Sequence, residues 1–166
     1  SAIMSTKPEL LAPAGNPDSF AAAVENGADA VYLGLQRLSA RAAAGNFSLD
    51  QLATLLPFAR SRKVAVYVAL NSLVTAGEVP AALDLLQSLA DLRVDAVIAQ
   101  DAGIFQLIAE HFAEIKLHAS TLMGAHNTAG VEELARLGAK RVVLARELSL
   151  AEIARIAVST EVEIEV

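Results

Sequence analysis

The stretch Glu161-Val-Glu-Ile-Glu-Val166 decides the fold, because it alternates charged and apolar residues after a long series of strand–helix units. Strict alternation puts three glutamates on one face of a strand and three apolar side chains on the other. A central strand of an open parallel sheet is apolar on both faces, whereas a barrel strand can direct a carboxylate such as Glu165 to the mouth. A solvated edge strand is the alternative for Glu161 and Glu163. No helix or polar tail follows, so we expect the front portion of a larger barrel.

Working back from this stretch, short apolar runs alternate with amphipathic segments, which favours βα units on a parallel sheet. The expected strands are 9–12, 30–34, 64–70, 96–99, 115–118, 141–145 and 161–166. Asn16 and Ser48 are expected to cap the first two helices, and another helix spans 78–92. Later helices start at Ala102, His126 and Ser149. Pro13 and the residues after it are expected to end the first strand.

These units average about 25 residues, and a complete (β/α)8 barrel takes about 250. The sequence therefore predicts an α/β, TIM-barrel-like (β/α) repeat, an incomplete barrel of about seven parallel strands. An open doubly wound sheet would fit the 166 residues without truncation, but its G-x-G-x-x-G fingerprint does not occur. We take residues 1–8 as a leader and 9–166 as the N-terminal barrel portion of a longer protein.

Composition excludes several classes of function. The net charge is −6 and there is no cysteine, which argues against a global basic field for nucleic acid and excludes disulfides and thiolate metal sites within these residues. No apolar run reaches the roughly 18 residues that span a bilayer, and no signal peptide is visible. We expect a cytoplasmic protein that is not in a membrane.

Polar residues follow the predicted strands, where βα folds build their sites. His118 is either an acid–base group or a satisfied core histidine, and Asp101 is either a helix cap or a site carboxylate. Asn71 either joins the site or merely ends the third strand. Arg41, in the long loop 35–47, is either solvated or clamps an anion.

Arg146 and Glu147 either form an ion pair that frames the next helix, or Arg146 holds a substrate carboxylate. The histidines lack metal-ligand spacing, so we expect no metal site. There is no nucleophile elbow, and a triad of Ser120, His118 and Asp101 lacks an oxyanion hole.

Several segments together carry a resemblance to a known family. They are Glu9-Leu-Leu-Ala-Pro-Ala-Gly15, Gly27-Ala-Asp-Ala-Val-Tyr-Leu-Gly34, Ser39-Ala-Arg41, Gln100-Asp-Ala-Gly103, His118-Ala-Ser-Thr121 and Val142-Val-Leu-Ala-Arg-Glu-Leu-Ser149. In these the chain resembles peptidase family U-thirty-two, the collagenase-like proteases, from Glu9 to Val166.

The resemblance implies a TIM-barrel-like N-terminal domain, followed in full-length relatives by cysteines that hold an iron–sulfur cluster. Such relatives hydroxylate RNA bases or a ubiquinone precursor, and others carry a peptidase label. By position, the resemblance implies His118, Asp101 and Glu165 as catalytic residues, and Arg41, Asn71, Asn127, Arg146 and Glu147 as substrate-binding residues. Leu122 and Gly124 depart from the residues that are common in the family.

Three hypotheses follow. The first is an enzyme fragment of an iron–sulfur-dependent hydroxylase, inactive by itself because these residues hold no cofactor. The second is a peptidase, and the third is a non-catalytic module that binds an anion. RNA or a small anionic ligand is the expected partner. Exposed sheet edges predict a homo-oligomer.

Overall fold

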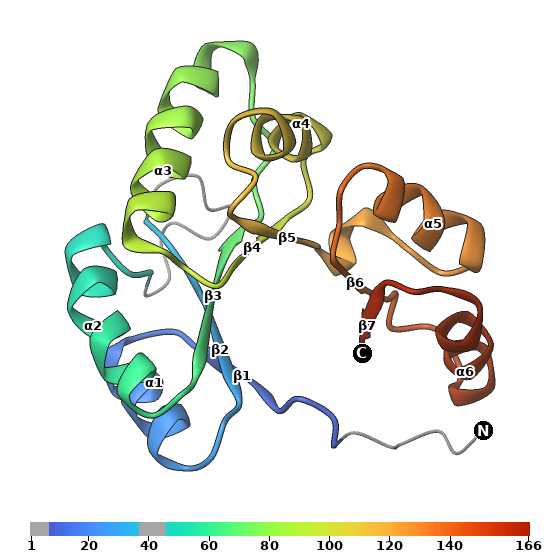
Figure 1. Cartoon of the computed structure of the whole chain (residues 1–166), viewed down its shortest axis with the longest axis horizontal. Coiled ribbons are helices and arrows are strands. Elements are labelled where there is room, and N and C mark those ends of the chain that lie inside the picture. The colour runs from blue at the N-terminus through green and yellow to red at the C-terminus, as the bar shows by residue number, and fades with distance from the viewer. Residues whose placement is uncertain (1–6, 37–45) are drawn as a thin grey trace.

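The computed structural model describes residues 7–36 and 46–166. Within them a parallel sheet alternates with helices (Figure 1). The strands are β1 (Leu11–Ala14), β2 (Ala30–Gly34), β3 (Ala65–Leu70), β4 (Ala96–Ala99), β5 (Lys116–Ala119), β6 (Arg141–Val143) and β7 (Glu163–Glu165). The helices are α1 (Pro17–Glu25), α2 (Leu49–Ser61), α3 (Val79–Leu92), α4 (Ala102–His111), α5 (Thr128–Arg136) and α6 (Leu150–Ser159), with short 3₁₀ turns η1 (Ala76–Glu78) and η2 (Thr121–Met123).

The strand order is β1-β2-β3-β4-β5-β6-β7, so each strand pairs with the next one along the chain. A doubly wound sheet reverses its strand order at a switch point and carries helices on both faces. Here the order never reverses, and the helices lie around the outside of a sheet that curls on itself (Figure 1). The predicted TIM-barrel-like incomplete barrel of seven parallel strands is confirmed.

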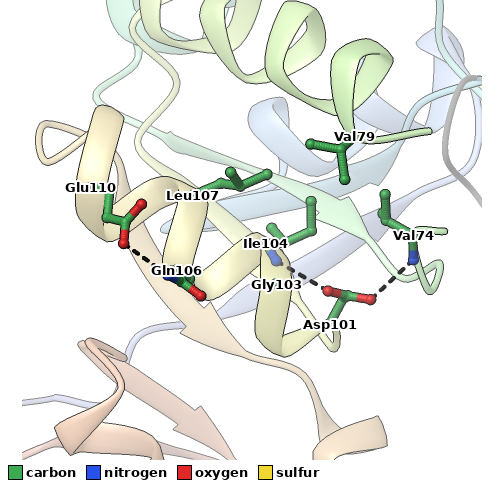
Figure 2. Close-up of a pocket in the computed structure, with 8 residues that line it drawn as sticks. All are labelled: Val74, Val79, Asp101, Gly103, Ile104, Gln106, Leu107 and Glu110. Atoms are coloured by element: carbon green, nitrogen blue, oxygen red, sulfur yellow. Dashed lines mark hydrogen bonds between the residues drawn. The ribbon is translucent and has the colours of Figure 1, made fainter. Parts of the chain in front are cut away.

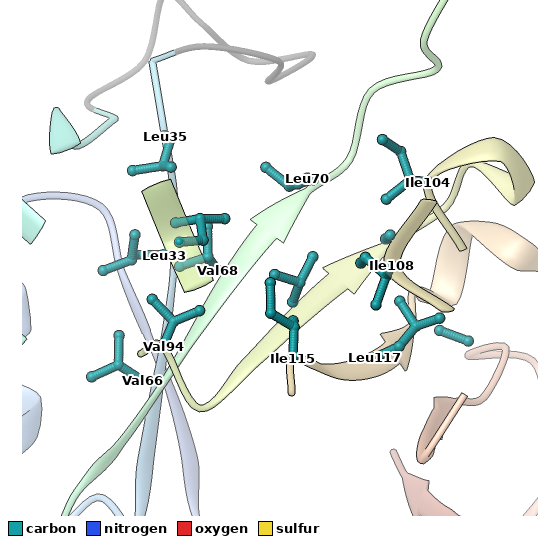
Figure 3. Close-up of a cluster of buried hydrophobic side chains, with 14 of the residues drawn as sticks. Leu33, Leu35, Val66, Val68, Leu70, Val94, Ile104, Ile108, Ile115 and Leu117 are labelled. Atoms are coloured by element: carbon teal, nitrogen blue, oxygen red, sulfur yellow. The ribbon is translucent and has the colours of Figure 1, made fainter. Parts of the chain in front are cut away.

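The main hydrophobic core lies between the sheet and the helices. Leu33, Val68 and Leu117 of the strands belong to this layer, as do Ile104 and Ile108 of α4 (Figure 3). Ile164 of β7 and Val162, just before β7, pack against the same core. The alternation of the last strand therefore directs its apolar face outward to the helices and its glutamates inward, as a barrel strand requires.

The opposite side of the sheet, which we call the inner face, follows from the strand register. One row across it joins Gly34, Ala69, Ile98, His118, Arg141 and Glu163. The next row joins Pro13, Tyr32, Tyr67, Ala96 and Lys116. In these two rows the inner face carries small residues, two tyrosines and Ile98 on β1 to β4, and polar residues on β5 to β7.

Helix caps fix where the helices begin. Asn16, Ser48 and Ser149 each accept a hydrogen bond from a backbone N–H three residues later and form capping boxes. These three starts agree with the sequence prediction. After α5, Gly138 has a φ of +108°, a left-handed conformation that suits glycine and ends the helix before β6.

Several element boundaries differ from the prediction by one or two residues, and two of the differences have a clear physical reason. Pro13 does not end the first strand but lies within β1, which is an edge strand and pairs with β2 alone in the described sheet. An edge strand tolerates proline because one of its sides needs no N–H donor. The predicted helix at His126 begins instead at Thr128, because the Asn127 side chain accepts a hydrogen bond from the Gly130 N–H and caps it.

None of the helices in the described ranges is long and apolar enough to cross a membrane.

Candidate functional site

Arg141 is the centre of a polar cluster on the inner face. Its guanidinium donates to Glu9 Oε1 at 2.6 Å and to Glu9 Oε2 at 3.3 Å. It also donates from Nε to Glu163 Oε2 at 2.9 Å, and its Nη1 lies 3.7 Å from Glu165 Oε2. Only 12% of the Arg141 side chain is exposed. Burial disfavours its charge, yet the hydrogen bonds to Glu9 and Glu163 dominate and raise its pKa.

Tyr67 joins this cluster from β3. Its hydroxyl donates to the Glu9 carboxylate at 3.0 Å, and the Arg141 guanidinium carbon lies 5.3 Å from the centre of its ring. Burial raises the pKa of Tyr67 to about 12, so its hydroxyl stays protonated and remains a donor. The hydrogen bond from Arg141 is the main reason that the pKa of Glu9 is lowered, and Glu9 is therefore a carboxylate that links β1 to β6.

His118 lies next to this cluster and is buried, with 2% of the residue exposed. Its ring packs edge-on against Tyr67 with the ring centres 4.8 Å apart, and its Nδ1 has no hydrogen-bond partner. Burial, followed by the positive charge of Arg141, lowers the pKa of His118 to about 4. His118 is therefore neutral at pH 7, able to accept at one ring nitrogen and donate at the other.

Two buried side-chain oxygens also lack hydrogen-bond partners. Glu165 Oε2 is one, and burial raises the pKa of this carboxyl. Asn71 Oδ1, one residue beyond β3, is the other, while the Asn71 backbone carbonyl accepts from Gln100 Nε2 at 2.8 Å. Buried polar atoms without partners are uncommon in folded proteins and mark positions where a ligand or water completes the bonding.

The cluster closes the amino end of the barrel rather than its mouth. Glu9 precedes β1, Arg141 opens β6 and Glu163 opens β7. The sequence prediction placed the site residues at the carboxyl ends of the strands and did not include Glu9, Tyr67 or Arg141. One feature of the sequence could have indicated this cluster, namely a charged residue at the first position of a strand. Arg141 and Glu163 are such residues, and both lie on the inner side of two adjacent strands.

Asp101 has both carboxylate oxygens occupied by backbone donors. Oδ1 accepts from the Ile104 N–H at 3.1 Å and caps α4, and Oδ2 accepts from the Val74 N–H at 3.0 Å (Figure 2). These contacts correspond to the helix-cap alternative of the sequence analysis. The adjoining groove of about 250 Å³ lies between the starts of α3 and α4, outside the inner face.

We expect Asp101→Ala to lower the free energy of unfolding by about 1–2 kcal/mol, because it removes a helix cap and an anchor for the loop after β3. Urea unfolding followed by circular dichroism measures this change. Asp84→Ala, on the exposed side of α3, is the matched control and should change stability by less than about 0.5 kcal/mol. Equal effects of the two variants would contradict the assigned role of Asp101.

The remaining predicted site residues that the structure describes follow the carboxyl ends of β5 and β6. Asn127 uses its side chain to cap α5. Arg146 and Glu147 follow β6 and are both exposed. Arg41 lies outside the described residues. The structure thus brings His118 and Glu165 to the inner face beside Arg141, and leaves Asp101 and Asn127 in capping roles.

The described residues offer no group of three or more His, Asp or Glu side chains that could hold a metal ion. The sequence has no cysteine. An iron–sulfur cluster held by thiolates therefore does not fit the ligands in these 166 residues.

The family model described as "Peptidase family U32" matches residues 15–166. The chain belongs to peptidase family U32. It is 34% identical over 163 residues to tRNA hydroxylation protein P1 of Bacillus subtilis, and the match covers 98% of this chain and 39% of the relative. It is 37% identical over 163 residues to the 23S rRNA 5-hydroxycytidine C2501 synthase of Escherichia coli, covering 98% of this chain and 24% of that one.

A solved structure of a U32 peptidase has the same fold. It superposes with a TM-score of 0.73 at 16% identity, covering 99% of this U32 chain and 71% of the other. At that identity the likeness supports the fold alone. The chain spans less than half the length of the two curated relatives.

Proposed function

We propose that this chain is the N-terminal barrel portion of a protein that hydroxylates bases in RNA. The observation that carries the proposal is the similarity, over 98% of this chain, to relatives whose names describe hydroxylation of tRNA and of a cytidine in 23S rRNA. Because the match runs through the whole strand series, the barrel is a part that these relatives share. A target in RNA implies action in the cytoplasm, where tRNA and ribosomes are.

Roles within the barrel follow from chemistry. His118 is neutral and buried beside Tyr67, and its Nδ1 has no hydrogen-bond partner, so this ring can form a hydrogen bond with a bound base. Glu165 lies beside Arg141 with one oxygen unpartnered and can accept a hydrogen bond from the base. Arg146, exposed after β6, can contact the phosphate backbone, and Asn71 can contact the base or the ribose.

The proposal includes an iron–sulfur cluster in the full-length protein. Its ligands would have to come from residues beyond the present sequence, since these residues provide no thiolate. The cluster would supply electron transfer. This chain would contribute the base-binding barrel, and we expect it to be inactive in isolation.

The decisive experiment removes the gene from the source organism and measures modified nucleosides in tRNA and 23S rRNA by mass spectrometry. We expect one hydroxylated pyrimidine to disappear and to return when the full-length gene is supplied. A full-length His118→Phe variant should restore far less of it than a matched His126→Asn variant. Unchanged nucleosides in both RNA classes would refute the proposal.

Proteolysis is the second candidate, because the family and its solved member carry the name peptidase. The described residues give it little support. Ser120 Oγ accepts from the Leu122 N–H, and both Asp101 oxygens accept hydrogen bonds from backbone N–H groups, so within the described residues these two side chains form no hydrogen-bonded triad with His118. Cleavage of denatured collagen by the purified full-length protein, lost on mutation of His118, would favour this candidate instead.

A homo-oligomer is a further part of the proposal. β1 and β7 are the two ends of the sheet order, and each has a side without a strand partner in the described sheet. Such edges favour association with another chain. Light scattering that gives a monomer at high concentration would contradict it.

A further inference from the structure

His118 Nδ1 is buried and has no hydrogen-bond partner among the described residues, although carboxylates lie around the ring. The ionisable groups that act on the ring, pack beside it or join the same cluster come from the segment before β1 and from four strands: Glu9, Tyr67 on β3, Lys116 on β5, Arg141 on β6, and Glu163 and Glu165 on β7. A carboxylate beside a histidine commonly accepts a hydrogen bond from the ring and favours its charged form. A group in this cluster therefore diverts the carboxylates from His118.

Arg141 is the group that holds these carboxylates. Its Nη1 and Nη2 donate to the two oxygens of Glu9 at 2.6 and 3.3 Å, and its Nε donates to Glu163 Oε2 at 2.9 Å. Arg141 is also the register partner of His118 on the adjacent strand, so the two side chains leave the same face of the sheet next to each other. The guanidinium therefore lies beside the imidazole and takes up the acceptors that the imidazole would otherwise use.

Tyr67 holds the ring of His118 without a hydrogen bond. The two rings pack edge-on, with their centres 4.8 Å apart and an angle of 74° between their planes. The Tyr67 hydroxyl donates to Glu9 at 3.0 Å, and the Arg141 guanidinium carbon lies 5.3 Å from the centre of the tyrosine ring. His118 is thus confined by an aromatic contact, while the hydroxyl of Tyr67 and the guanidinium of Arg141 are both engaged with carboxylates.

The protonation state of His118 decides what its ring can offer to a ligand. A neutral imidazole has one acceptor nitrogen and one donor, whereas an imidazolium has two donors and no acceptor. Burial and the positive charge of Arg141 lower the pKa of His118 to about 4, while Glu163 and Glu9 act in the opposite direction. Lys116 also disfavours the charged ring, but this residue is exposed and its effect is the smallest of these. Without Arg141, the charges left around the ring would be mostly those of carboxylates, which favour the imidazolium.

We propose that Arg141 is a positioning residue for His118, binding the carboxylates around the ring so that His118 stays uncharged and keeps one nitrogen free to accept a hydrogen bond from a ligand. The inference goes beyond the proposed function, which gives Arg141 no part in substrate binding. It rests on that function in one respect, that the ligand is the RNA substrate. Glu9 and Tyr67 then hold Arg141 in place, and Arg141 acts on the substrate only through His118.

The test measures the protonation of His118 directly, by NMR of the ring nitrogens of the ¹⁵N-histidine-labelled chain between about pH 8 and pH 4, with His118→Phe to assign the signals. In the wild-type chain we expect the ring to titrate only near pH 4. Arg141→Gln removes the positive charge and keeps amide donors for Glu9. It should raise the proton affinity of His118 at least about tenfold, moving its pKa from about 4 towards its ordinary value of 6.5. Arg141→Lys keeps the charge and should leave the pKa of His118 near 4, as should Lys116→Gln, the exposed control.

Two results of this titration would overturn the inference. An unchanged pKa of His118 in folded Arg141→Gln would mean that burial alone keeps the ring neutral, and an equal rise in Arg141→Lys would mean that the charge of Arg141 is not the cause. Should Arg141→Gln fail to fold, a second variant that combines it with Glu165→Gln removes a partly buried carboxylate and keeps Glu9 and Glu163, so it should show the same rise.

A second readout links the effect to the substrate. In the deletion strain, full-length Arg141→Lys should restore more of the hydroxylated nucleoside than Arg141→Gln at equal protein levels, and equal restoration would also overturn the inference. The pKa of His118 is measured without RNA. Unchanged nucleosides in the deletion strain would therefore refute the proposed function and not the effect of Arg141 on His118.

Discussion

Arg141→Met is expected to lower the free energy of unfolding by about 2 kcal/mol, because it leaves the partly buried carboxylates of Glu9 and Glu165 without their cation. Glu9 and Glu165 are the groups most affected, with 34% and 21% of their side chains exposed. Glu163 is 65% exposed and can be solvated, so it contributes less. Urea unfolding at neutral pH measures the change.

Arg136→Met is the matched control. Arg136 pairs with Glu133 one turn away on α5, and its side chain is 74% exposed. Exposed pairs of this kind contribute well under about 1 kcal/mol. A double-mutant cycle of Arg141→Met with Glu9→Gln should also show coupling between the two residues. Equal losses for Arg141 and Arg136, or no coupling to Glu9, would contradict the role given to Arg141.

The second large effect concerns pH. The folded chain lowers the pKa of His118 to about 4 from its ordinary value of 6.5, mainly through burial. As the pH falls, His118 therefore binds a proton in the unfolded chain before it does so in the folded chain. The folded state loses stability as a result. The contribution of His118 is fully present above about pH 6.5 and is lost progressively towards pH 4, amounting to about 3 kcal/mol.

His118→Phe removes the titrating group and keeps an aromatic ring against Tyr67, so we expect its stability to vary much less between pH 6.5 and pH 4. Denaturant midpoints measured across this range give the comparison. Glu9 and Glu165 titrate in both proteins, so the difference between the two curves isolates His118. His126→Asn, in the exposed segment before α5, should follow the wild-type curve. A wild-type stability that is flat over this range would contradict a buried neutral His118.

Local patterns predicted most of the fold because the deciding signals are local. Three helix starts can be predicted from capping boxes that span only a few residues, those at Asn16, Ser48 and Ser149. The apolar run from Ala65 to Leu70 predicts a buried strand without reference to the rest of the chain. The alternating glutamates of β7 indicate a sheet with a polar interior. The direction of curling follows once each strand pairs with its neighbour.

The polar cluster was beyond such reasoning, because its members are far apart in the sequence and belong to the amino end of the barrel. Glu9 looked like the start of a strand, and Arg141 like a residue that begins one. Their contact depends on how far the sheet curls, which no short pattern encodes. Asp101 and Asn127 show the reverse case, since a carboxylate or amide at a strand end suits both a site and a helix cap.

The hydrogen bonds between Arg141 and Glu9 join residues that are 132 positions apart. Pairing of neighbouring strands closes only short loops, so the sheet can be assembled step by step as the chain is synthesised. The hydrogen bonds between Arg141 and Glu9 cannot form until β6 has been synthesised. Until then the Glu9 carboxylate has no Arg141 guanidinium to neutralise it. Acquisition of the final curvature is therefore a late event in folding, and a ribosome-bound chain that stops before Arg141 should hold its first strand only loosely.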